Sequence, residues 1–176
     1  MLKIFFILIA LIFAIVLILA ATKPDTFRVE RSASIKAPPE KIFPYLNDFH
    51  QWTAWSVWEK KDSDMKTTYS GSLSGKGAVY EWDGNNNVGK GRMEIVESTI
   101  PTKLIVKLDF SAPMEGHNKA EFTLQADGDN TKAIWVMDGP SPFISKLIGV
   151  FISMDKMIGK DFEDSLANLK AAAEKS

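Results

Sequence analysis

Residues 27–43 read FRVERSASIKAPPEKIF, and this stretch decides the fold class. Apolar and polar residues alternate from Phe27 to Ile35, a period of two that is typical of a strand with one buried and one wet face. Pro38 and Pro39 follow, and proline is tolerated in the first turn of a helix. The stretch therefore predicts a strand that passes through a short turn directly into a helix.

The same alternation recurs further along the chain, at residues 104–110, 118–126 and 133–138. Turn-forming sequences such as 84–87 and 127–130 separate these runs. Loops this short join antiparallel neighbours, since parallel strands need a long crossover. We therefore expect an antiparallel meander of about six strands after the first strand, which gives a sheet of about seven strands.

The C-terminal part predicts one long amphipathic helix from about Phe143 to Ala173. Its apolar residues recur at spacings of three and four, and a rod of this length reaches about 45 Å, enough to cross the sheet. The predicted fold class is thus α+β, with a curved antiparallel sheet wrapped on a long C-terminal helix. A strongly curved sheet cannot pack flush against a straight rod, so we expect space between them.

The N-terminus carries an unbroken apolar run at residues 4–21, preceded by one charge, Lys3. A helix of that length covers about 27 Å, close to the hydrocarbon core of a bilayer. The alternative is a cleaved signal peptide, but the run is long and lacks a good small-x-small exit. We predict a membrane anchor at 1–22, a linker at 23–26 and one domain of sheet and helices at 27–176.

The charges on the two sides of this single-pass anchor favour opposite orientations. Lys3 and the amino terminus favour a cytoplasmic N-terminal end, whereas Lys23, Arg28 and Arg31 after the span favour the opposite topology. Charges within a folded strand count for less, so we favour an extracytoplasmic domain. The opposite orientation stays open.

Composition excludes several function classes. The net charge of −1 offers no basic field for nucleic acid. The chain has no cysteine and two histidines, which argues against metal sites, and no sequence feature predicts a cofactor. Residues 84–90 match the start of a phosphate-binding loop, but Gly91 replaces the required Ser or Thr, and the segment joins two strands. We read it as a hairpin turn.

With this element order, the chain resembles the START/Bet v 1-like superfamily, also called SRPBCC or the polyketide cyclase/dehydrase family. The resemblance covers about residues 27–173 and rests on residues 31–43, which lead to Asn47-Asp48-Phe49, Trp52 and Trp55, and on the closing helix. It implies a helix-grip fold with a deep apolar pocket for lipids, sterols, polyketides or other hydrophobic molecules. The family has no universal catalytic motif, so no catalytic residue is assigned. The N-terminal span departs from the simplest members.

Aromatic and methionine side chains supply most of the candidate pocket residues, because apolar sites have aromatic walls with few polar anchors. Asp155 lies between Phe151 and Ile158 on or near the buried stripe of the long helix, and a carboxylate there needs a partner. Asp155 could anchor a polar group of a ligand or bond to a group on the sheet such as His117, but an edge position that reaches water is the favoured interpretation. It is kept among the candidates. The candidate ligand-binding residues are Trp55, Tyr80, Trp82, Phe110, Phe122, Trp135, Met137, Phe151, Met154, Asp155 and Ile158.

Three function hypotheses follow. The leading one is a membrane-anchored module that binds a lipid-like or other hydrophobic small molecule between sheet and helix. The second is a cyclase or dehydratase-like enzyme in the same cavity, which needs a buried acid or base, with Asp155, Glu81 and His117 as candidates. The third is a protein-interaction module, which a filled cavity and a large exposed apolar patch would favour.

Overall fold

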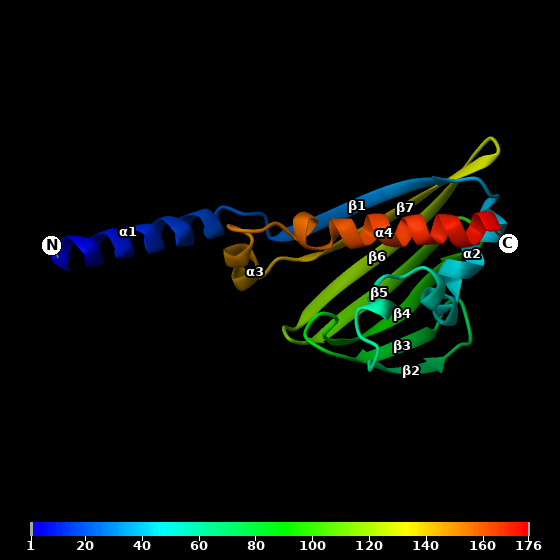
Figure 1. Cartoon of the computed structure of the whole chain (residues 1–176), viewed down its shortest axis with the longest axis horizontal. Helices are drawn as coiled ribbons and strands as arrows, with labels where there is room; N and C mark the ends of the chain where they lie inside the picture. Colours follow the sequence, from blue (N-terminus) through cyan, green and yellow to red (C-terminus); the bar gives the residue numbers. More distant parts are fainter. Residues whose placement is uncertain (1, 176) are drawn as a thin grey trace.

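A computed structural model of the chain describes residues 2–175. Within them, one antiparallel sheet of seven strands has the order β1-β7-β6-β5-β4-β3-β2 (Figure 1). Strands β2 to β7 form a meander, and β1 pairs with β7 at the far edge. The predicted α+β fold class and strand number are confirmed. The strands are β1 (Thr26–Ile35), β2 (Lys66–Gly71), β3 (Ala78–Asp83), β4 (Lys90–Thr99), β5 (Lys103–Ala112), β6 (Gly116–Asp127) and β7 (Asn130–Pro140).

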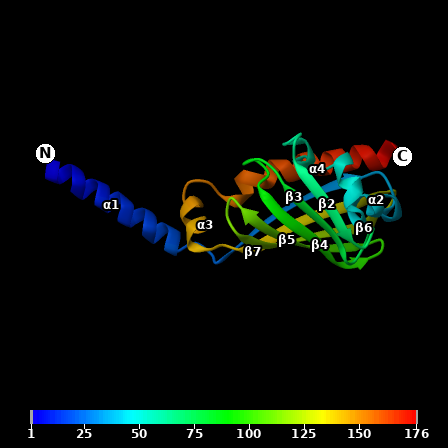
Figure 2. The same ribbon diagram turned by 90° about the horizontal axis from the view of Figure 1, so that it is seen from below.

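Helices cover one face and one end of this sheet. The longest of the domain, α4, lies along the inner face, and α2 closes the end where the chain terminates (Figure 2). The predicted turn from strand to helix is present: β1 ends at Ile35 and α2 begins at Pro39, while buried Thr131 donates a 2.7 Å hydrogen bond to the Ala37 carbonyl. The helices are α1 (Leu2–Ala21), α2 (Pro39–Asn47), η1 (Phe49–Ala54), η2 (Trp58–Lys60), α3 (Phe143–Ile148) and α4 (Met154–Lys175).

The prediction of one continuous helix from Phe143 to Ala173 is wrong, because the segment is divided at residues 149–153. Glycine is a poor residue for a helix interior, and the Gly149 amide closes α3 by donating to the Ser145 carbonyl. Ser153 then accepts a 3.3 Å bond from the Lys156 amide, as a residue at a helix start does. The division turns α3 away from the sheet and towards α1.

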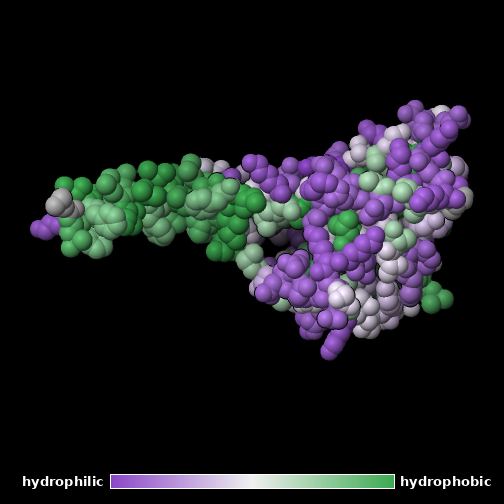
Figure 3. Space-filling view, viewed as in Figure 1, coloured by the Kyte–Doolittle hydropathy of each residue, from purple (hydrophilic) through white to green (hydrophobic). Residues whose placement is uncertain are grey.

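Helix α1 projects from the domain as an apolar rod (Figures 1 and 3). Among the described residues it is the one helix long and apolar enough to cross a membrane. Nearly all its side chains are exposed, so it is not a core helix of this domain. By length and composition alone, an N-terminal helix of this kind also fits a signal sequence.

The packed core lies at the end of the sheet away from α1, which we call the distal end. There the C-terminal half of α4 and the apolar face of α2 meet the inner side chains of the strands. Fully burying one such large side chain contributes about 1.5–3 kcal/mol. The side chains of this core with the least exposure include Ile35, Ile42, Leu46, Phe49, Trp55, Ile95, Leu104, Val106, Phe122, Phe162 and Leu169.

Candidate functional site

A cavity of about 900 Å³ lies between the sheet and the N-terminal half of α4. We call the end of the domain next to α1 the mouth end, because the cavity reaches the surface there among Asp25, Pro142 and Ser145. Met154 and Ile158 face the cavity from α4 and are only half-buried. Because the opposing residues of β6 include Gly116 and Ala120, this end of the layer stays hollow.

The cavity wall is aromatic. Tyr80 stacks on Trp82, and Trp82 meets Phe110 edge-on with ring centroids 5.4 Å apart. Trp135 lies at the inner limit, where it stacks on Phe162 at 3.9 Å and separates the cavity from the distal core. Such walls are typical of sites for apolar small molecules.

One acidic side chain, Glu59, faces this wall. The Tyr80 hydroxyl donates a 2.7 Å hydrogen bond to Glu59 Oε1, and both residues line the cavity. The segment before Glu59 is held against α4, since the Val57 amide donates to Ser165 Oγ and Asn168 donates to the Trp55 carbonyl. Burial raises the pKa of the Glu59 carboxyl, and it also raises the pKa of Tyr80. The pair can accept or donate a hydrogen bond inside a mainly apolar cavity.

The second polar group is the Trp135 indole. Its Nε1 is buried, and no residue of the described chain accepts a hydrogen bond from it. The other three buried indoles are satisfied: Trp52 Nε1 donates to the Leu46 carbonyl, Trp55 Nε1 to the Tyr45 carbonyl and Trp82 Nε1 to the Val88 carbonyl. An unpartnered buried donor costs about 1–3 kcal/mol, and Trp135 Nε1 is such a donor beside the cavity.

The structure divides the predicted ligand-binding residues into two groups. Trp55 and Phe122 belong to the distal core and do not line the cavity, and Phe151 is 76% exposed in the segment between α3 and α4. Aromatic content alone cannot separate these positions, since core and wall use the same residue types. Those lining the cavity are Tyr80, Trp82, Phe110, Trp135, Met137, Met154 and Ile158; their role in binding stays a prediction.

Asp155 lies outside the cavity and does not pair with His117, so the structure has the edge position that the sequence analysis favoured. Its carboxylate is half exposed and accepts a 2.7 Å bond from Arg31 Nη1, while Arg31 Nε donates to Glu163 Oε1. The guanidinium crosses α4 over Gly159, where a Cβ atom would come within 2.2 Å of Arg31 Nη2. The hydrogen bond from Arg31 lowers the pKa of Asp155.

Of the other two acid–base candidates, Glu81 faces water, whereas His117 lines the cavity at its mouth. Glu81 is exposed and does not line the cavity. His117 lies at the mouth end with a 62% exposed side chain, where its hydrogen bonds with Asp109 and then Glu115 raise its pKa. Among residues 2–175 no group of three His, Cys, Asp or Glu residues is placed to hold a metal ion.

Glu59 is a partly buried acid–base residue of the cavity that the sequence analysis missed. The available signal was a carboxylate next to Trp58 in an aromatic-rich segment. Neither helix nor strand periodicity applies to this segment of two short 3₁₀ helices. The spacing of residues therefore could not predict which way the Glu59 side chain points. Trp52, Trp58, Met65, Met93, Leu108 and Asn118 also line the cavity without having been among the candidates.

Known proteins agree with this architecture. A protein from Chromobacterium violaceum, CV1439, is similar at a TM-score of 0.57 with 16% identity, over 86% of this chain and 99% of that one. The Aha1 protein from Colwellia psychrerythraea has a TM-score of 0.57 and 16% identity, over 84% of this chain and 96% of that one. The di-domain ARO/CYC protein BexL of the BE-7585A biosynthetic pathway has a TM-score of 0.59 and 15% identity, over 89% of this chain and 52% of that one. At these identities the likeness shows the fold alone.

The sequence itself matches a family profile over most of its length. The profile described as "Polyketide cyclase / dehydrase and lipid transport" matches residues 26–174, which include every strand of the sheet and most of α4. No curated protein matches the chain. The helix-grip domain and its profile match therefore show that this chain belongs to the polyketide cyclase/dehydrase and lipid transport family.

Proposed function

We propose that the protein is a membrane-anchored binding module for a lipid-like or other hydrophobic small molecule. The observation that carries this proposal is the open cavity of about 900 Å³, with its aromatic and methionine wall, in a chain that also has the apolar helix α1. Its volume suits one molecule of drug or lipid size. Residues 4–21 would hold the module in the bilayer, with the domain on the extracytoplasmic side.

The polar groups of the cavity narrow the ligand class. Trp135 Nε1 offers one donor, and Glu59 with Tyr80 offers a second hydrogen-bonding position. Phe110, Met137 and Ile158 offer apolar contact only. The ligand that fits best is therefore a mainly apolar molecule with at least one hydroxyl or carbonyl oxygen.

Tryptophan fluorescence of the full-length chain in nanodiscs tests this proposal. Trp52, Trp58, Trp82 and Trp135 line the cavity, so a dibrominated fatty acid that enters should quench them. Native mass spectrometry of the same sample should show a co-purified apolar mass. An unquenched chain without any bound apolar mass would overturn the proposal.

Ala120→Trp supplies the matched variant, because Ala120 lines the cavity and an indole there would occupy ligand space. Displacing two buried methylene groups removes about 1.6 kcal/mol, so the variant should bind at least about tenfold more weakly. Leu73→Trp is the control, since Leu73 is 87% exposed and lies outside the cavity.

A second candidate function, an enzyme of the cyclase or dehydratase type, is favoured by one observation. Glu59 is a partly buried carboxyl with a raised pKa that faces the cavity, as a general acid or base must be. If incubation with an apolar extract gives a ligand of changed mass, and Glu59→Gln retains the unchanged ligand, the enzyme is supported. A ligand that stays unchanged with both forms supports the binding module.

The size and openness of the cavity count against the third hypothesis, a pure protein-interaction module. Such a module would need no internal space, and side chains would be expected to fill it. The cavity is instead continuous with the surface at Pro140 and Pro142.

A further inference from the structure

The mouth end carries an exposed apolar surface that the binding function does not explain. We call this surface the mouth patch; it consists of Phe143, Ile144, Ile148, Phe151 and Ile152. We propose that the mouth patch rests in the interface of the bilayer that α1 enters, so that the cavity opens onto lipid. The entry of ligand from the lipid rests on the proposed function. The docking of the mouth patch requires only that α1 spans the bilayer.

The exposure of these side chains is large for a domain surrounded by water. Phe143, Ile144 and Phe151 are 51%, 52% and 76% exposed. They follow one another within a short segment, and the apolar surface of α1 continues onto this end of the domain beside a hollow (Figure 3). Contiguous apolar patches of this kind are typical of protein or membrane contacts.

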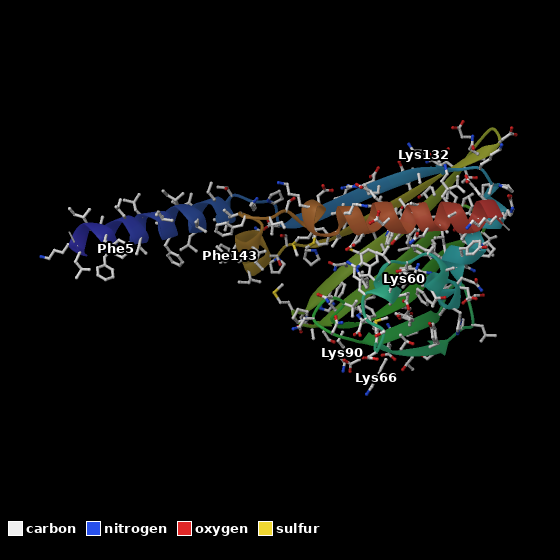
Figure 4. All side chains as sticks on the ribbon, viewed as in Figure 1. Phe5, Lys60, Lys66, Lys90, Lys132 and Phe143 are labelled. Atoms are coloured by element: carbon white, nitrogen blue, oxygen red, sulfur yellow. The ribbon has the colours of Figure 1, made fainter. Side chains whose placement is uncertain are left out.

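The level of the mouth patch relative to the bilayer follows from its attachment to α1. Helix α3 packs beside the C-terminal end of α1, where Ala20 is fully buried. Figure 4 shows Phe143 on α3 next to this end of α1. An ion pair between Lys146 and Asp25 joins α3 to the residue before β1. If α1 spans the bilayer, α3 therefore lies at the level where the span leaves the hydrocarbon.

The connection between anchor and domain keeps this end close to the membrane. Residues 22–25 separate Ala21 of α1 from Thr26 of β1, and four residues reach no more than about 14 Å. The Ser141 amide also donates a 2.7 Å hydrogen bond to the Asp25 carbonyl, which ties the end of β7 to the same linker. The domain cannot turn its mouth far from the bilayer without breaking these contacts.

The cavity opens at the same place. Ser145 of α3 and residues 140–142 form one side of the opening, and Met114, which is 48% exposed, lies on the other side in the loop between β5 and β6. A ligand that leaves the bilayer at this point passes from apolar lipid to an apolar wall. It therefore avoids the cost of exposing its chain to water.

The bilayer suits this surface better than a soluble partner or a second copy of the chain. The patch is continuous with a helix that has the length and composition of a membrane span, and it is tied to that helix by α3. A soluble partner would have to approach within the reach of a four-residue linker. The alternatives give different outcomes in the following test.

Site-specific labelling of the full-length chain tests the docking. Because the sequence has no cysteine, Phe151→Cys can carry a single environment-sensitive fluorophore, with Leu73→Cys at another exposed position as the control. The probe membrane is a phosphatidylcholine vesicle with brominated acyl chains. We expect the label at position 151 to be quenched by the brominated chains and shielded from aqueous iodide, and the label at position 73 to show the opposite.

Two results would overturn the docking. One is a label at position 151 that iodide quenches as strongly as the label at position 73. The other is a label that is shielded from iodide but not quenched by brominated chains, since protein then covers the patch instead of lipid.

Kinetics of uptake test the entry route separately. Phe143→Ser with Phe151→Ser should slow the transfer of a brominated fatty acid from vesicles to the cavity tryptophans several-fold, with the same final quenching. An unchanged rate would refute entry through the mouth patch. If even the unaltered chain shows no quenching, the proposed function fails with the route, while the cysteine labels still decide the docking.

Discussion

The two ends of the layer between sheet and α4 are built from the same residue types but differ in packing. At the distal end, Phe122 and Leu169 are almost fully buried among the strands, α2 and α4. At the mouth end, Phe110 and Ile158 are half-buried and line a cavity. The difference arises because α2 adds a second set of apolar side chains, Ile42, Phe43 and Leu46, at the distal end.

This comparison shows how a small domain can be both stable and hollow. The distal core supplies the burial that holds the sheet on α4, so the mouth end need not be filled. Trp135 stacks on Phe162 at the boundary and belongs to both regions. Four predictions follow for this division, from the largest expected effect to the smallest.

Phenylalanine truncation should separate the ends most clearly. Phe122→Ala removes a fully buried ring from the distal core and should lower the free energy of unfolding by about 3–5 kcal/mol. Phe110→Ala removes a half-buried ring from the cavity wall and should cost less than about 1.5 kcal/mol. Urea unfolding of the full-length chain in nanodiscs measures both. Equal losses would contradict the division into core and wall.

Replacing Trp55 in the distal core and Trp135 beside the cavity should lower stability by different amounts, because only the Trp55 indole has a hydrogen-bond acceptor in the described chain. Trp55→Phe leaves the Tyr45 carbonyl without its donor, whereas Trp135→Phe removes an indole that has no acceptor in the described chain. In the ligand-free chain, Trp55→Phe should therefore be the more destabilising by about 1 kcal/mol. With ligand present, Trp135→Phe should weaken binding, as measured by the tryptophan quenching described above. Unchanged affinity would show that no ligand oxygen accepts from Trp135.

The carboxyl of Glu59 should give the cavity a pH dependence. Burial raises its pKa above the ordinary value of 4.5, so the folded state binds the proton more tightly than the unfolded state. Its contribution to stability is then present below pH 4.5 and is lost as the pH rises through the folded-state pKa. Glu59→Gln should be more stable than the natural chain at neutral pH, with no such gain at pH 4. Thermal unfolding at several pH values checks this, and a gain independent of pH would contradict it.

The ion pair between Asp155 and Arg31 should matter least for stability. Because its carboxylate is largely in water, Asp155→Asn should change stability only slightly, and salt should reduce even that effect. Ligand uptake should not change, since Asp155 lies outside the cavity. A clear loss of uptake in the quenching assay would place Asp155 in the site after all.

Much of the fold was predictable because it depends on local patterns. The alternation from Phe27 to Ile35 and the prolines at 38 and 39 predicted the strand and the helix that follow it, and both are present. The short turns predicted the antiparallel meander. The break at Gly149 was missed because the apolar spacing continues across it, so periodicity alone favoured a single helix.

The site was only partly predictable. Tyr80, Trp82 and Trp135 were among the candidates and line the cavity, yet Trp55 was an equally good candidate and lies in the core. Glu59 was not predicted, because its position depends on contacts between residues 55–57 and a helix more than 100 positions later in the chain. Asp155 was a candidate because its helical phase places it near the buried stripe, and the structure has it at the edge of that stripe, paired with the Arg31 guanidinium that lies over Gly159.

By itself, the sequence determined the seven-stranded sheet, the covering helix, the apolar N-terminal helix and the absence of a cysteine-based site. These depend on hydrophobic periodicity and composition, which are properties of neighbouring residues. Only the tertiary structure decided which aromatic rings fill the core and which line a cavity, and that the cavity opens beside α1. Those outcomes depend on where α2 and α3 come to lie, and contacts between distant segments leave no periodic pattern in the chain.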